Sequence, residues 1–295
     1  MILIDREIKC SGRADEFEIY AFGDVHLGAR GCAEKQLKRV VKEVCTKKNS
    51  YWFGGGDMFD CIKPQDAKRF DIESLPDWLF EGTAAKTKER LSDILSQQLD
   101  RGVDIFKSID TKCLGILQGN HEHSIKVHYN EDIHRHFCRR LKVQSLTDEA
   151  LIRLRFKRNG GGATIILYVW HGFGGGRTRG AEPNKLGIML DEWECADLCF
   201  RGHSHIFNIL PPKPVMGIPR SGALPKELAC KYRWAANWGC WVLSHSVGPS
   251  TYASRAGYPA RPMLTVKAVI KPFTHKMVKG KWVETPHVEL RAITI

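Results

Sequence analysis

The sequence predicts an α/β fold in which buried strands alternate with amphipathic helices. Five short apolar runs each end in a cluster of glycine and polar residues, at 17–22, 51–53, 113–117, 164–170 and 197–200. Runs of β-branched and aromatic residues bounded by glycine are typical of buried strands that end in loops. In such folds, functional side chains gather at the carboxyl ends of the strands. We therefore expect a site where these five runs end.

Four segments between the strands have helical periodicity. They are residues 33–46, 84–100, 131–141 and 182–194. The first has one apolar face, formed by Leu37, Val40, Val41 and Val44. The second has another, formed by Leu91, Ile94, Leu95 and Leu99. Apolar residues spaced three and four apart predict helices packed against a core.

The pattern changes after about residue 206. Five prolines between 211 and 225 predict an irregular stretch, and β-like segments follow at 238–244 and 263–270. Lys279-Gly-Lys-Trp-Val predicts a hairpin turn before a last strand at 287–295. We expect this strand-rich part, 208–295, to belong to one domain with the first part, so that residues 1–295 form a single domain.

The charge of the chain indicates the chemical class of its partners. The 295 residues have a formal net charge of +12 at pH 7. Such an excess favours polyanions, namely nucleic acid, nucleotides or a phospholipid surface. No apolar run approaches the roughly 20 residues of a membrane helix, and the first residues become charged at once, so we expect neither a transmembrane segment nor a secreted precursor.

The cysteines indicate a reducing compartment. The sequence has ten of them and contains no Cys-x-x-Cys pair. Several lie in apolar segments, as in Cys113-Leu-Gly-Ile-Leu. We expect reduced thiols that mostly fill the core, and a cytoplasmic location.

Seven side chains able to bind metal ions follow the five strands. They are Asp24, His26, Asp57, Asn120, His171, His203 and His205. Oxygen and nitrogen donors without a thiolate suit Mn, Fe, Zn, Ni or Co, and argue against a cysteine-type zinc site. Asp57 is the natural bridge, since one carboxylate can give an oxygen to each of two ions. Asp24, His26 and one histidine then remain for the first ion, and Asn120 with two histidines for the second.

The motifs around these residues resemble those of the calcineurin-like metallophosphoesterases. The resemblance extends over residues 16–207 and rests on Gly23-Asp-Val-His26, Gly55-Gly-Asp57, Gly119-Asn-His-Glu122, His171-Gly172 and Gly202-His-Ser-His205. It implies a four-layer α/β fold, a two-sheet β-sandwich flanked by helices, with the metal site at the carboxyl ends of the strands.

The resemblance also implies two divalent metal ions, with Mn as the first expectation. Asp24, His26, Asp57 and His205 would hold one ion. Asp57, Asn120, His171 and His203 would hold the other. Asn120 is expected to contact substrate as well.

Three residues beside the ligands have expected roles. The resemblance implies that His121 contacts phosphate and protonates the leaving group; the alternative is that it only orients its neighbour. Glu122 is expected to support the ligands from behind. Asp60 is expected either to hydrogen-bond a ligand histidine or to cap a following helix.

The expected reaction is the hydrolysis of a phosphate ester by a hydroxide that bridges the two metal ions. Gly23-Asp-Val-His-Leu-Gly28 and Gly55-Gly-Asp-Met-Phe-Asp60 are similar to the opening motifs of the Mre11/SbcD-type DNA nucleases. Together with the net charge, this favours a phosphodiester in DNA, RNA or a nucleotide. The glycine-rich loop after His171 contains Arg177 and Arg179, which we expect to bind phosphate oxygens unless the loop is an ordinary surface loop.

Two other functions stay open. One is a phosphomonoesterase, acting on protein or on a small molecule. In the phosphoprotein branch an arginine stands two residues past the motif histidine, whereas His123 stands there in this chain. The other is a non-catalytic nucleic-acid-binding or scaffold protein that retained the fold, which the complete ligand set argues against.

Overall fold

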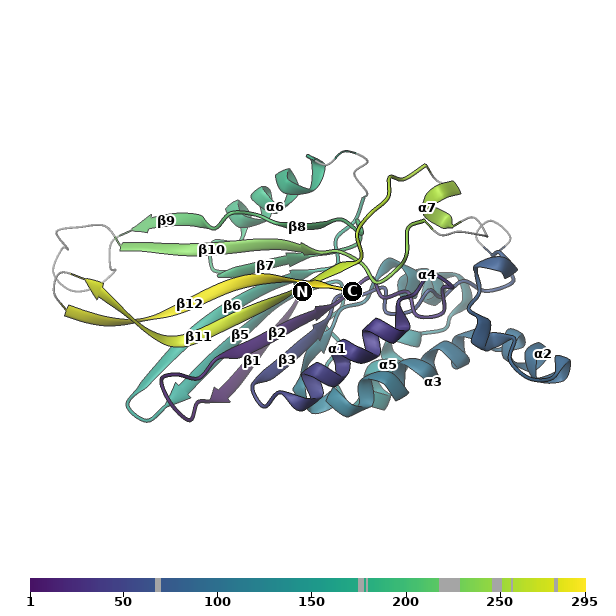
Figure 1. Cartoon of the computed structure of the whole chain (residues 1–295), viewed down its shortest axis with the longest axis horizontal. Helices are drawn as coiled ribbons and strands as arrows, with labels where there is room; N and C mark the ends of the chain where they lie inside the picture. Colours follow the sequence, from purple (N-terminus) through teal and green to yellow (C-terminus); the bar gives the residue numbers. More distant parts are fainter. Residues whose placement is uncertain are drawn as a thin grey trace.

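Two β-sheets pack face to face in the computed structural model, and helices cover the outer face of each sheet (Figure 1). The structure describes residues 1–66, 70–174, 178, 180–217, 229–245, 251–255, 257–278 and 281–295. The predicted fold class, a two-sheet α/β sandwich flanked by helices, is confirmed.

The five-stranded sheet contains the strands that lead into the first three motifs. Its order is β12-β11-β2-β3-β4, in which β2, β3 and β4 are parallel and β11 is antiparallel to both of its neighbours. The strands are β2 (Phe17–Phe22), β3 (Ser50–Gly54), β4 (Cys113–Ile116), β11 (Leu264–Val278) and β12 (Lys281–Thr294). Every residue of β2 is buried, because this strand lies between the other sheet and a layer of helices.

The seven-stranded sheet contains the strands that lead into the last two motifs. Its order is β1-β5-β6-β7-β10-β8, with β9 paired to β10. The strands are β1 (Ile2–Lys9), β5 (Glu149–Arg158), β6 (Gly161–Trp170), β7 (Leu198–Arg201), β8 (Phe207–Ile209), β9 (Lys213–Gly217) and β10 (Ala229–Trp238). Because β6, β7 and β10 are parallel, the loops after β6 and β7 leave the sheet at the same edge.

Apolar side chains fill each interface between layers. Between the two sheets, the rings of Phe53 and Phe200 lie 5.4 Å apart. On the outer face of the five-stranded sheet, Phe106 packs edge-on against Phe22 at 5.4 Å. On the outer face of the seven-stranded sheet, Leu186 belongs to a smaller buried cluster. The strand ends that position the candidate site are therefore held between packed layers.

The α-helices are α1 (Glu34–Thr46), α2 (Ala84–Ser92), α3 (Ile94–Phe106), α4 (Asn120–Tyr129), α5 (Ile133–Leu141), α6 (Ala181–Glu192) and the four-residue α7 (Tyr252–Arg255). The 3-10 turns are η1 (Ile72–Ser74), η2 (Asp77–Leu79) and η3 (Lys107–Lys112). The helices predicted at 33–46, 131–141 and 182–194 are confirmed as α1, α5 and α6.

The single helix predicted over 84–100 is wrong. Asp93 has φ −133° and ψ 51°, outside the helical region, and separates α2 from α3. Its side chain accepts the backbone N–H of Ser96 and so caps α3. The apolar spacing continues across the break because both helices face the same core.

The carboxyl-terminal part completes both sheets. The strand predicted at 263–270 lies within β11, and the predicted hairpin is confirmed by the antiparallel pairing of β11 with β12. Its turn residues, 279 and 280, lie outside the described residues. The strand predicted at 238–244 is wrong, because β10 ends at Trp238 and Val242 forms an isolated bridge with Cys32. β10 joins β7, and β11 joins β2.

No helix in the described parts of the chain has both the length and the apolar character that crossing a membrane requires. All ten cysteines lie within the described residues, and none of them forms a disulfide.

Candidate metal centre

The seven candidate ligands lie just past the ends of β2, β3, β4, β6 and β7, where the backbone turns sharply. Five of them have a left-handed backbone, with φ of 50° at Asp24, 48° at His26, 48° at Asp57, 68° at His203 and 57° at His205. Residues with a side chain rarely adopt this conformation, and they concentrate at functional sites. The turns direct these side chains back toward a common centre.

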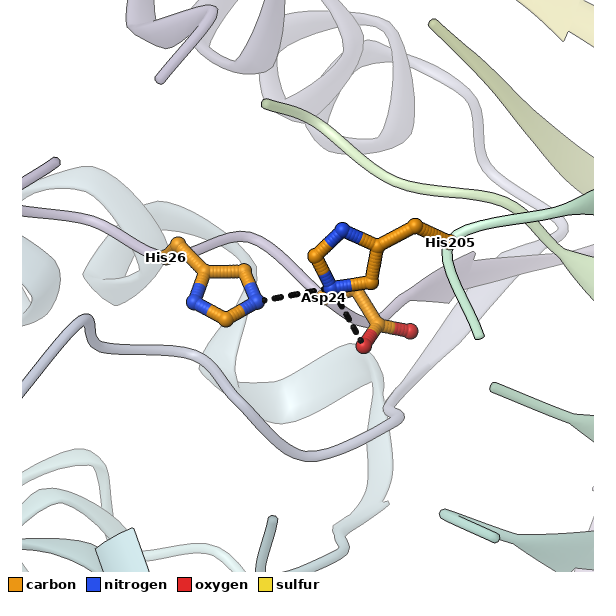
Figure 2. A group of neighbouring side chains, drawn as sticks. All are labelled: Asp24, His26 and His205. Atoms are coloured by element: carbon orange, nitrogen blue, oxygen red, sulfur yellow. Dashed lines mark hydrogen bonds and ion pairs between the residues drawn. The ribbon is translucent and has the colours of Figure 1, made fainter. Parts of the chain in front are cut away.

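Asp24, His26 and His205 form the first group of potential ligands (Figure 2). The Nε2 atoms of the two histidines face each other at 3.1 Å, and Nε2 of His205 lies 3.4 Å from Oδ1 of Asp24. Figure 2 shows the two imidazoles and the carboxylate pointing toward one another. These three residues come from the loops after β2 and β7, so the site joins the two sheets.

Asp57, His171 and His203 form a second group. Nε2 of His171 lies 3.4 Å from Oδ2 of Asp57. The amide oxygen of Asn120 lies 3.1 Å from Nε2 of His171 and 2.7 Å from Nδ1 of His203. The structure thus places Asn120 beside His171 and His203, the two histidines that the resemblance implies for the same ion.

Asp57 lies between the two groups. Its Oδ2 is 3.8 Å from Nε2 of His26 and 3.4 Å from Nε2 of His171. Its Oδ1 accepts the backbone N–H of His121, in the first turn of α4, at 2.9 Å. Burial favours the neutral acid, but the positive charges of His171, His121 and His26 hold the pKa of Asp57 well below its usual range.

The buried donors fit a divalent cation. Oδ1 of Asp24 is buried and has no hydrogen-bond partner among the described residues. A buried carboxylate oxygen without a partner is costly unless a cation faces it. Burial raises the pKa of Asp24 to about 6. A divalent cation held by Asp24, His26 and His205 would satisfy this oxygen and favour the ionised carboxylate.

The histidines divide into two electrostatic classes. Burial alone lowers the pKa of a histidine, yet the neighbouring aspartates raise it to about 9 at His26 and about 10 at His171. At His203, burial and the positive charge of His171 lower the pKa to about 4. Burial and the charge of His26 also hold the pKa of His205 well below its usual value.

His121 lies next to His26, one of the first group of potential ligands. Its Nδ1 donates to the backbone carbonyl oxygen of Asp60 at 2.6 Å, which leaves Nε2 as the second functional nitrogen. The ring packs edge-on against His26 at 4.6 Å. With His26 and Asp57 it forms a third group of potential ligands.

Glu122 and Asp60 contact the loops and side chains of the candidate ligands. The buried carboxylate of Glu122 accepts the backbone N–H groups of Asp57, Phe59 and Gly119 at 3.1, 3.1 and 2.9 Å. Oδ1 of Asp60 lies 3.4 Å from Nδ1 of His26. Residues 61–66 form no helix, so the first of the two roles expected for Asp60 is the one observed.

Arg177 and Arg179 lie outside the described residues. The two described residues just before this loop, Phe173 and Gly174, are held through their backbone carbonyl oxygens. Arg201 donates to the carbonyl oxygen of Phe173 at 2.7 Å, and its guanidinium forms a buried ion pair with Glu182. Lys185 donates to the carbonyl oxygen of Gly174 at 2.8 Å.

The sequence did not indicate two residues near the centre. The indole nitrogen of Trp238 donates to Asp24, and the positive charge of Arg261 contributes to the low pKa of His205. Nε of Arg261 is buried without a hydrogen-bond partner among the described residues. Trp238 ends an apolar strand and Arg261 follows a region of irregular sequence, so neither stands in a recognisable motif.

The chain resembles the calcineurin-like metallophosphoesterases. The basis is now both the order of its motifs and the layered fold that brings them to one place.

No protein-family model matches the sequence, and no curated protein matches it. Among solved structures, the chain is similar to a predicted phosphoesterase from Streptococcus pneumoniae, with 12% identity, 92% of this chain and 99% of that chain covered, and a TM-score of 0.34. It is also similar to the zinc complex of Vps29 from Entamoeba histolytica, with 11% identity, 94% and 98% coverage and a TM-score of 0.37. An NAD nucleotidase from Haemophilus influenzae has 10% identity, 94% and 50% coverage and a TM-score of 0.36.

Proposed function

We propose that the chain is a hydrolase of phosphate esters that uses two divalent metal ions. The observation that supports this most directly is the position of Asp57. Its Oδ2 lies 3.8 Å from Nε2 of His26 in the first group and 3.4 Å from Nε2 of His171 in the second. Asp24, His26, Asp57 and His205 would hold the first ion. Asp57, Asn120, His171 and His203 would hold the second.

The two ions, when bound, would activate a water molecule and stabilise charge on the phosphoryl group. The chain's own residues then have distinct tasks. Oδ1 of Asn120 faces His171 and His203, so the amide nitrogen is free to donate to a phosphate oxygen. The carbonyl of Asp60 fixes the ring of His121 through Nδ1, so a proton on Nε2 can pass to the leaving group.

We propose a phosphodiester of nucleic acid or of a nucleotide as the substrate. The net charge of +12 supports a polyanionic partner. Nε of Arg261 is buried without a hydrogen-bond partner among the described residues, and the charge of this guanidinium contributes to the low pKa of His205. This supports a positively charged side chain of the protein close to the proposed substrate. Arg177 and Arg179 remain proposed phosphate ligands. Replacing both by alanine should raise KM for the diester without changing metal binding, and unchanged kinetics would remove their loop from the site.

The test compares two chromogenic reporters, a phosphodiester and a phosphomonoester, hydrolysed by the Mn-loaded protein under identical conditions. We expect Mn-dependent turnover that is faster with the diester and is lost after chelation of the metal. Asp104→Asn, which changes an exposed carboxylate on α3, is the control and should not alter the rate.

A strong preference for the monoester would contradict the proposed substrate and indicate a phosphatase. No turnover of DNA, RNA, nucleotides or either reporter, despite bound metal, would contradict the proposed hydrolysis and indicate a binding or scaffold protein.

A further inference from the structure

The last residue of β10, Trp238, is completely buried beside the first group of ligands. Its indole nitrogen donates a hydrogen bond of 2.6 Å to Oδ2 of Asp24, which is also completely buried. The two residues are 214 positions apart in the sequence. They meet because β10 is parallel to β7, and both strands end at the edge of the sheet where the ligands lie.

Three of the motif loops close around this indole ring. Gly23, Gly55 and Gly202 each lie so near the ring that a Cβ atom at any of them would overlap it. None of the three has a positive φ, so the requirement for glycine at these positions is one of space. The indole therefore packs against the backbone of the three loops that contain Asp24, Asp57 and His203.

The hydrogen bond determines which oxygen of Asp24 faces the ligands. Oδ2 accepts two N–H groups, from the indole of Trp238 and from the backbone of His203 at 3.0 Å. Oδ1 accepts none from the described residues and lies 3.4 Å from Nε2 of His205. A carboxylate with one oxygen saturated by donors is fixed in orientation, and partners of this kind tune metal affinity.

We propose that Trp238 is a positioning residue of the metal centre, which holds Asp24 so that Oδ1 becomes the ligand atom for the first ion. The inference rests on the metal-binding part of the proposed function and not on the hydrolysis.

The chain provides a matched control in Trp241. This side chain is also completely buried, and its ring stacks on Phe22 at 5.5 Å. Its indole nitrogen has no hydrogen-bond partner among the described residues. Trp238→Phe and Trp241→Phe thus remove similar volumes from the core, but only the first removes a hydrogen bond to a ligand.

The experiment is a calorimetric titration of the metal-free full-length protein with Mn²⁺, which requires no turnover. Two ions should bind to the wild type and to Trp241→Phe with equal affinities. In Trp238→Phe, one of the two ions should bind roughly 10- to 100-fold more weakly. Thermal unfolding without metal establishes that each variant is folded. Equal affinities in all three proteins, or equal losses in both variants, would overturn the role of Trp238, whereas a wild type that binds no Mn²⁺ would overturn the proposed function as well.

A second measurement uses the wild type and so does not depend on how a variant folds. In a ¹H–¹⁵N NMR spectrum, one equivalent of Zn²⁺, a diamagnetic probe, should shift the indole N–H signal of Trp238 and leave that of Trp241 unchanged. An indole signal of Trp238 that does not respond would contradict the proposal.

Discussion

The oxygen Oδ2 of Asp57 lies within 4 Å of a histidine from each group of ligands, and no other carboxylate among the described residues has this position. At the scale of single residues, the proposed two-ion centre therefore depends on Asp57 more than on any other candidate ligand. The carboxylate also accepts the N–H of His121 at the start of α4, where the helix dipole favours a negative charge.

Asp57→Asn should abolish Mn-dependent hydrolysis. The amide has one oxygen in place of two, and it has no negative charge to bridge two cations. Steady-state rates of the Mn-loaded variant test this expectation. Near-normal turnover would contradict the two-ion assignment, because a second ion without Asp57 would have only Asn120, His171 and His203 as ligands.

Glu122 is a second residue whose effect can be measured. Glu122→Ala removes the acceptor of three buried N–H groups in the Asp57 and Gly119 loops. Unsatisfied buried donors are costly, so the free energy of unfolding should fall by about 3 kcal/mol or more. Urea unfolding measures it. Glu89→Ala on the exposed side of α2 is the control and should change the stability by less than about 0.5 kcal/mol. Similar values for the two variants would rule out this role of Glu122.

At the scale of elements, the loops that follow the strands were easier to predict than the elements on either side of them. Glycines next to Asp24, Asp57 and Asn120 mark the strand ends locally, so these candidate ligands stand out in the sequence. Helix α4 has no apolar stripe, because its buried residues are Glu122 and Ile125. It therefore has no apolar periodicity in the sequence, although it begins at the candidate ligand Asn120.

Gly119 shows how closely a loop and a ligand are packed. A Cβ atom at this position would overlap the backbone nitrogen and Oδ1 of Asp57. Gly119→Ala should therefore displace Asp57 and reduce the number of bound Mn²⁺ ions below two, measured by elemental analysis after dialysis. Gly187→Ala, in the middle of α6 with open space around it, is the control. It should bind two ions and be more stable by about 0.5–1 kcal/mol, since alanine favours a helix. If Gly119→Ala still binds two ions, the loop can shift to admit the Cβ atom, and this result would contradict the prediction.

At the scale of the whole molecule, the contacts that complete the site connect distant parts of the sequence. Trp238 reaches Asp24 because β10 is inserted beside β7, and β11 covers the edge of β2. Pairings between strands so far apart in the sequence leave no local pattern, so the fold class could be predicted but not the neighbours of each candidate ligand.

The strands β1 and β5 were not predicted from the sequence for a related reason, because they pair with each other although they are far apart in the sequence. Their alternating charged residues pair with each other, as Arg153 and Arg155 do with Asp5.

Global stability should depend on pH through His134, which is buried in α5 next to the hydroxyl of Ser145 at 2.8 Å. Burial lowers its pKa to about 4, whereas a histidine in the unfolded chain has the ordinary pKa of 6.5. Below pH 6.5 the unfolded chain binds a proton that the folded chain does not. The free energy of unfolding is therefore unaffected by the titration of His134 above pH 6.5, and it falls by on the order of 3 kcal/mol as the pH is lowered toward 4.

Urea unfolding between pH 7 and pH 4 tests this dependence. His134→Gln should lose less stability over the range than the wild type. His136→Gln, which changes an exposed histidine of the same helix, should follow the wild type. Parallel curves for all three proteins would exclude a role for His134 in the acid response.

The central claim is that two metal ions, bound by the seven ligands together, make the chain a phosphoesterase. Its most direct test is a titration of the metal-free wild type with Mn²⁺ in which bound metal and phosphodiester hydrolysis are measured on the same samples. The account predicts that hydrolysis rises to its plateau as the second ion per chain binds. A plateau at one ion per chain, or two bound ions with no hydrolysis, would contradict it.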